Sequence, residues 1–302
     1  MKIRTLCWLL AFMLIFSGCA LKSSDIIYRD TEPLDESTIP SEITLSTNAS
    51  DSSETIAETE PSVPETEPAV ETTLPETTME DQSLYISPGR HQFRYEDPNT
   101  NDYLDYHLFV PNNPQKDMPL VIFLHGMGEV NKIDELQNYG IASVIYQLYG
   151  ENFPFFLLMP CTHERSWSKE QIPATLKGLI DETVASLSID TDHIILTGHS
   201  LGAIGTWRMI SNYGNFFSCA VPVSCGIDEE LDFSNFADIP IWGFVGTDGY
   251  YEVNYHKAMV KLVEEINQNG GHAVLTVYEG FEHHETISYP YTYELFDWML
   301  AQ

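Results

Sequence analysis

The stretch that decides the fold is Ile195-Leu196-Thr197-Gly198-His199-Ser200-Leu201-Gly202-Ala203. An apolar run typical of a buried strand leads into a serine flanked by glycines, and then into residues typical of a helix. Gly198 to Gly202 fits the G-x-S-x-G pattern, in which a sharp strand-to-helix turn lifts a serine above the end of a sheet. A helix N-terminus at Ser200 also favours negative charge that develops there. The sequence therefore predicts a nucleophilic serine; the alternative is a turn whose serine has no chemical role.

Apolar runs of strand length alternate with longer helical runs through the C-terminal part of the chain. Strands are predicted at 91–95, 103–110, 120–124, 155–159, 193–197, 220–224, 241–245 and 273–278. Helices are predicted at 132–149, 172–187, 200–213, 253–269 and 291–300. This alternation predicts an α/β fold, a mostly parallel sheet with helices on both faces. The first two strands are expected to form an antiparallel hairpin at one edge, and the interval from Cys225 to Pro240 leaves room for only a small cap.

The N-terminus has the features of an export signal. Lys2 and Arg4 precede an apolar run, Cys7 to Phe16, that is too short to span a bilayer. The run ends in Phe16-Ser17-Gly18-Cys19, which resembles a bacterial lipoprotein signal and implies cleavage after residue 18 with lipid attached to Cys19. The alternatives are an ordinary secretory signal and an uncleaved anchor. In each case the chain is expected to leave the cytoplasm, and the lipid would hold it to the membrane at the bacterial cell surface.

Residues 19–83 form a low-complexity segment rich in Ser, Thr, Glu and Pro, and from Ser23 onward its one basic residue is Arg29. Such a composition buries too little apolar surface to offset the chain entropy lost on folding. We therefore expect a disordered acidic stalk. The folded, catalytic domain is expected at residues 84–302, a length that suits one hydrophobic core.

Charge and cysteine content exclude several classes of function. The chain has a formal net charge of -31, and residues 84–302 hold 10 Lys and Arg against 29 Asp and Glu. Nucleic acid is therefore not expected as a partner. Cys161, Cys219 and Cys225 lack the spacing of metal ligands. No metal is expected, and the chemistry of a nucleophilic serine implies no cofactor.

A second glycine-rich turn follows the predicted strand 120–124. His125-Gly126-Met127-Gly128-Glu129 would leave backbone N–H groups facing a ligand at the end of the sheet. Acyl transfer needs two such donors for the oxyanion. The expected pair is the amide of Met127 and the amide of Leu201, the residue after the nucleophile; the alternative for this segment is a plain turn.

A serine nucleophile also needs a base and an acid that orients the base. In this type of fold the three follow in the order Ser, Asp or Glu, His. Asp248 comes directly after the predicted strand 241–245 and is the expected acid, with Glu252 as its rival. His283 and His284 follow the last predicted strand, and one of them is expected to be the base.

Residues 120–302 resemble secreted α/β-hydrolase esterases, nearest to the group of predicted peptidases, polyhydroxybutyrate-depolymerase-like enzymes and feruloyl or acetylxylan esterases. The matching segments are His125 to Glu129, Met159-Pro160 with Trp167, Gly198 to Gly202 with Gly205-Thr206-Trp207, Ile239 to Trp242, Gly270-Gly271, and Tyr278 five residues before His283. The last spacing favours His283 over His284. Val245-Gly246-Thr247-Asp248 is one residue shorter than the group's usual segment at the acid.

The resemblance implies a serine hydrolase that cleaves carboxylic esters through an acyl-enzyme, with Ser200, His283 and Asp248 as its triad. The ester substrate would be a small molecule or an oligosaccharide, including acyl groups on plant polysaccharide. Trp167, His125 and His199 are candidates for substrate contacts, each with a structural role as the alternative. A serine peptidase for small peptides and a non-catalytic surface binding module on the same fold remain the other interpretations.

Overall fold

The computed structural model describes residues 25–29, 86–227 and 230–302. The export signal, Cys19 and the predicted stalk apart from residues 25–29 lie outside these ranges. Within them no helix is long and apolar enough to cross a membrane.

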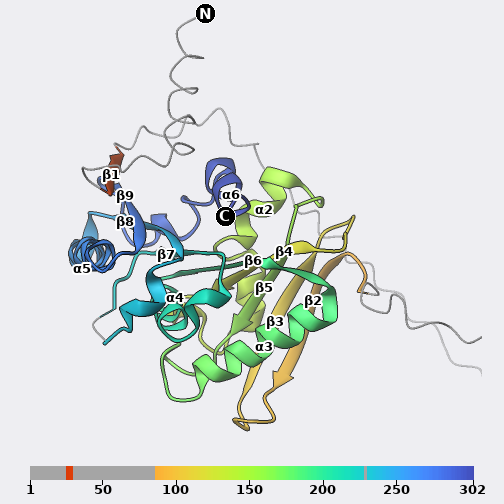
Figure 1. Cartoon of the computed structure of the whole chain (residues 1–302). Coiled ribbons are helices and arrows are strands. Elements are labelled where there is room, and N and C mark those ends of the chain that lie inside the picture. Colours follow the sequence, from red (N-terminus) through yellow and green to blue (C-terminus); the bar gives the residue numbers. More distant parts are fainter. Residues whose placement is uncertain (1–24, 30–85, 228–229) are drawn as a thin grey trace, which may run out of the picture. The chain divides into compact units, whose positions relative to one another are not determined.

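The described chain is built around one nine-stranded sheet, with strand order β1-β9-β8-β7-β6-β4-β5-β3-β2 (Figure 1). The strands are β1 (Ile26–Arg29), β2 (Gly89–Glu96), β3 (Tyr103–Val110), β4 (Met118–Leu124), β5 (Phe156–Cys161), β6 (Ile189–His199), β7 (Cys219–Val223), β8 (Pro240–Gly246) and β9 (His272–Tyr278). Neighbours are parallel except at β2–β3 and β3–β5. The α/β fold is confirmed, and so is the antiparallel hairpin at one edge.

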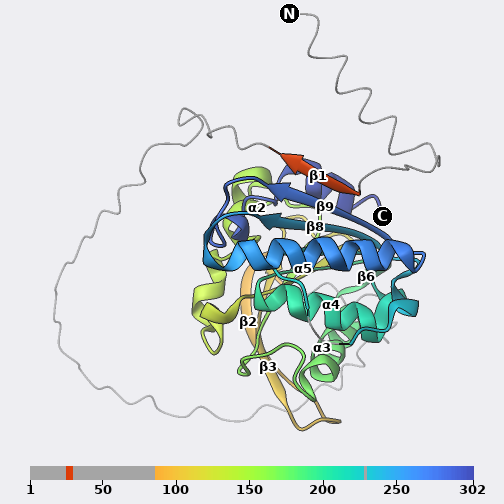
Figure 2. The ribbon, with the colours of Figure 1, turned by 90° about the vertical axis from the view of Figure 1, so that its left-hand side faces the viewer.

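Helices cover both faces of the sheet. Figure 2 shows α3 (Ile172–Leu187), α4 (Leu201–Tyr213) and α5 (Gly249–Gln268) together on one face. The other face packs against α2 (Ala142–Tyr149) and α6 (Tyr293–Met299) in a core with β4, β5 and β6. Four of these five helices begin within four residues of where the sequence places them; the exception is α2.

The predicted helix at 132–149 is in fact two elements, a 3-10 helix η3 (Ile133–Asn138) and α2. Gly140 separates them with a φ of 53°, a conformation that glycine adopts at little cost. A Cβ at Gly140 would stand 2.2 Å from the ring of Phe123. The helix is therefore interrupted at Gly140, where the backbone packs closely against Phe123 of β4.

Strand β1 corrects the prediction that residues 19–83 are disordered throughout. Ile26 to Arg29 pairs in parallel with Leu275 to Tyr278 at the free edge of β9. The physical reason is local composition, because Ile26-Ile27-Tyr28 is a short run of residues with high β-propensity inside an otherwise polar segment. Ile26 packs against the core beneath α5, and Arg29 forms an exposed ion pair with Glu294.

Candidate active site

The turn between β6 and α4 has the geometry that its sequence predicts. Ser200 adopts φ 57° and ψ -115°, a strained backbone conformation that is common at functional sites. A Cβ at Gly202 would stand 1.9 Å from the carbonyl oxygen of Leu124, and one at Gly198 would stand 2.5 Å from that of Gly202. Both glycines are therefore required for α4 to begin this close to β4 and β6.

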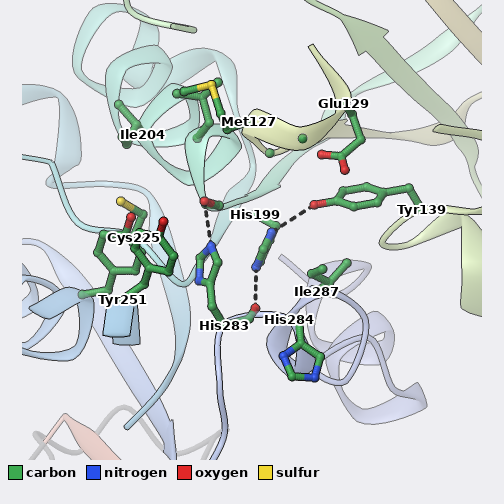
Figure 3. Close-up of a pocket in the computed structure, with 15 residues that line it drawn as sticks. Met127, Glu129, Tyr139, His199, Ile204, Cys225, Tyr251, His283, His284 and Ile287 are labelled. Atoms are coloured by element: carbon green, nitrogen blue, oxygen red, sulfur yellow. Dashed lines mark hydrogen bonds between the residues drawn. The ribbon is translucent and has the colours of Figure 1, made fainter. Parts of the chain in front are cut away.

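Ser200 lies against His283, on the loop that follows β9. The two side chains form a hydrogen bond, with 2.8 Å between Ser200 Oγ and His283 Nε2. In Figure 3 a dashed line from the labelled His283 imidazole marks this hydrogen bond. This is the arrangement in which an imidazole can take the proton of an attacking hydroxyl.

The carboxylate on the other side of His283 belongs to Glu252. Its Oε1 lies 2.6 Å from His283 Nδ1, and its Oε2 accepts a hydrogen bond from the backbone N–H of Gly246 at 2.9 Å. The side chain of Glu252 is fully buried. A buried carboxylate held in this way fixes the imidazole with Nδ1 protonated and Nε2 free to accept from serine.

The prediction that Asp248 contacts the base is therefore wrong. Asp248 is an exposed N-cap residue of α5 whose Oδ1 accepts a hydrogen bond from the backbone N–H of Gly249 at 2.8 Å. The helix starts at Gly249 rather than at Val253, so Glu252 falls in its first turn. Side chains in a helix tilt toward its N-terminus, which carries the Glu252 carboxylate back to the end of β8.

The main chain of His283 is held by two donors that the sequence did not reveal as partners. Its carbonyl oxygen accepts from Thr286 Oγ1 at 2.8 Å and from His199 Nε2 at 3.1 Å. Ser224 donates in turn to Thr286 at 2.6 Å. Burial lowers the pKa of His199 to about 3, so His199 is a neutral imidazole.

An open cavity of about 440 Å³ lies over Ser200 and His283. Met127, Leu201 and His199 are among its lining residues, together with Tyr251 and Tyr255, whose rings contact the His283 imidazole. Leu201 is the first residue of α4, and the first N–H groups of a helix have no partner within it. The structure thus brings the two residues of the predicted oxyanion site to the serine.

Two predicted substrate contacts are wrong. His125 and Trp167 are fully buried and do not line the cavity over Ser200. Trp167 Nε1–H donates to the carbonyl oxygen of His125 at 3.0 Å, and His125 Nε2 accepts from the backbone N–H of Thr162 at 3.1 Å. These two side chains tie the loop after β5 to the end of β4, which is a structural role.

His284, the rival base, lies in the lining of the cavity but points away from the serine. Its side chain is 73% exposed and lies 3.6 Å from a carboxylate oxygen of Glu282. Within the described ranges no group of three His, Cys, Asp or Glu side chains could hold a metal. Cys161, Cys219 and Cys225 are buried, and none of them forms a disulfide within the described residues.

Comparison with solved structures identifies the fold of the chain. The chain superposes on a thermostable esterase with a TM-score of 0.61 and 29% identity, over 70% of this chain and 63% of the esterase. It has the α/β-hydrolase fold. FphF, a fluorophosphonate-binding serine hydrolase of Staphylococcus aureus, shares that fold at a TM-score of 0.56 and 14% identity, over 71% of this chain and 99% of the other.

The comparisons by sequence give one partial match and no family. The bifunctional acetylxylan esterase/xylanase XynS20E of Neocallimastix patriciarum is 26% identical over 124 residues, 40% of this chain and 18% of that protein. The chain thus spans less than two thirds of both XynS20E and the thermostable esterase. No protein-family model matches the sequence.

Proposed function

We propose that this chain is a serine hydrolase that cleaves carboxylic esters. One observation carries the proposal: Ser200, on a strained turn, is hydrogen-bonded to His283, which is hydrogen-bonded to the buried Glu252. Ser, base and acid follow in the chain order of α/β-hydrolases.

In the proposed reaction Ser200 Oγ attacks the ester carbonyl while its proton passes to His283 Nε2. The amides of Met127 and Leu201 stabilise the oxyanion of the tetrahedral intermediate. His283 then gives the proton to the departing alcohol oxygen, which leaves an acyl group on Ser200. Water attacks this acyl-enzyme while its proton passes to His283 Nε2. His283 then returns the proton to Ser200 Oγ as the bond to the acyl group breaks, which releases the carboxylic acid and regenerates the serine. Glu252 stabilises the imidazolium that forms in both halves of the reaction.

The similarity to XynS20E and to esterase structures supports an ester rather than a peptide as the substrate, with acyl groups on plant polysaccharide as one class. The cavity is open and lies under no large lid among the described residues, since β7 and β8 are joined there by one short 3-10 helix, η5 (Phe233–Phe236). Bulky esters could therefore reach Ser200.

The test is kcat/KM on a short-chain nitrophenyl ester, on acetylated and feruloylated saccharides, and on small peptides. Ester hydrolysis is expected, and Ser200→Ala should lower kcat by about 10⁶-fold. Ser234→Ala, a serine in η5, is the matched control and should retain full activity. If the enzyme hydrolyses peptides but not esters, it is a peptidase and not an esterase. If it binds esters without hydrolysing them, it is a binding module and not an enzyme.

We also propose that the protein is exported and anchored to the membrane through lipid on Cys19. The basic start, the short apolar run and the residues before Cys19 support this. Cells fed a labelled fatty acid should incorporate it into the wild-type chain and not into Cys19→Ala, while Ser23→Ala should be labelled normally. Equal labelling of the Cys19→Ala chain would disprove the anchor.

A further inference from the structure

The cavity over Ser200 contains one carboxyl group and no basic side chain of Lys or Arg. Its lining residues include Glu129, Tyr139 and His199, and Glu129 is the one Asp or Glu among them. Lys132 lies near Glu129 but is paired with Glu135 at 3.1 Å. No described lysine or arginine within the cavity wall therefore neutralises this carboxyl.

The hydrogen bonds around His199 show where the proton of Tyr139 goes. His199 Nε2 faces the carbonyl oxygen of His283, an acceptor, so this nitrogen carries the imidazole proton. His199 is neutral, and its Nδ1 can only accept. The Tyr139 hydroxyl lies 3.2 Å from Nδ1 and must donate to it. Its single proton is thereby engaged.

One carboxylate oxygen of Glu129 is consequently left without a donor. Its Oε2 is buried and accepts no hydrogen bond, although it lies close to Tyr139 around Gly126. Burial raises the pKa of Glu129. A buried carboxylate oxygen with no partner is unfavourable, and a donor that enters the cavity would satisfy it.

We propose that Glu129 determines substrate specificity: it selects esters that bring an N–H or O–H donor to its side of the cavity and disfavours esters that carry a carboxylate. Figure 3 shows this side, formed by Glu129 and Tyr139, opposite Tyr251 and Cys225. The proposal rests on the esterase function proposed above. In this role Glu129 affects which substrate group binds and leaves the reaction at Ser200 unchanged.

The test measures kcat/KM for nitrophenyl esters of a six-carbon acyl chain that ends in a methyl, hydroxyl, ammonium or carboxylate group. A second series carries the same end groups on the alcohol of an acetyl ester. In one of the series the wild-type enzyme should favour the ammonium over the carboxylate ester by about ten- to hundredfold, the range of one charge-assisted hydrogen bond. Glu129→Gln, which keeps the shape and removes the charge, should reduce this ratio to near one.

Glu135→Gln is the matched control, because it removes a neighbouring exposed charge outside the cavity wall and should leave the ratio unchanged. The hydroxyl ester distinguishes a general donor site from a purely cationic one. An unchanged ratio in Glu129→Gln, or an equal loss in Glu135→Gln, would overturn the proposal. The methyl ester separates the two hypotheses: its hydrolysis, absent in Ser200→Ala, establishes the esterase whatever the outcome for Glu129.

Discussion

At the scale of single residues, the acid of the triad is the point on which sequence and structure differ. Sequence order and the end of β8 pointed to Asp248, while the hydrogen bond to His283 comes from Glu252. The sequence pattern alone could not distinguish Asp248 from Glu252, because the identity of the acid depends on whether α5 starts at Gly249 or at Val253. Ser200 was predictable, because a strained turn imposes strong local constraints on sequence. The strand end narrowed the base to His283 or His284, and the resemblance to known esterases favoured His283.

Two isosteric variants distinguish Glu252 from Asp248 as the acid of the triad. Glu252→Gln should lower kcat/KM by about 10⁴-fold, because an amide facing His283 Nδ1 favours the wrong tautomer and cannot stabilise the imidazolium. Asp248→Asn should have little effect, since asparagine also caps helices. Ester hydrolysis near pH 7 measures both, and a severe loss in Asp248→Asn with a mild one in Glu252→Gln would refute the assignment.

Buried histidines make stability depend on pH. Burial lowers the pKa of His125 to about 4 and that of His199 to about 3, against about 6.5 in an unfolded chain. Below about pH 6.5 the unfolded state therefore binds protons that the folded state does not. Each of these residues should lower the free energy of unfolding as pH falls, with a limiting slope of about 1.4 kcal/mol per pH unit until its folded pKa is reached.

Urea unfolding between pH 6.5 and 5 gives this slope. His125→Gln should reduce it by the contribution of one histidine, whatever its effect on stability at pH 7. His284→Gln, at an exposed position, should leave the slope unchanged. If His125→Gln keeps the full slope, His125 is not the neutral buried imidazole described above.

At the scale of secondary structure, most strands were predictable because buried parallel strands are short apolar runs bounded by turns. Two elements were not. Gly140 breaks the predicted 132–149 helix for a tertiary reason, its close approach to Phe123. Strand β1 pairs with β9 across more than 240 residues of sequence, and composition averaged over the acidic segment conceals it.

Strand β1 offers a test of whether this segment stabilises the domain. Ile26 packs on the core, whereas the next residue, Ile27, is 40% exposed, as expected for alternating faces of a strand. Ile26→Asp should therefore lower Tm, by about 2–4 °C for each kcal/mol lost. Ile27→Asp should change it much less. Equal Tm values for Ile26→Asp and wild type, measured by calorimetry, would mean that β1 contributes nothing.

At the scale of the whole molecule, the sheet brings together groups from distant parts of the chain. Met127 follows β4, Ser200 follows β6, Glu252 follows β8 and His283 follows β9. The carboxyl ends of parallel strands meet at one edge, so four separate segments meet there. The α/β-hydrolase fold explains why the order of residues along the chain predicted most of the site.

Covalent labelling reports directly whether Ser200 is the activated nucleophile. The full chain is treated with a fluorophosphonate, and the modified residue is identified by mass spectrometry of its peptides. We expect one phosphonylated residue, Ser200, with labelling abolished in Ser200→Ala and strongly slowed in His283→Ala and Glu252→Gln. Labelling at a different residue, or none in a folded chain that binds esters, would contradict this assignment.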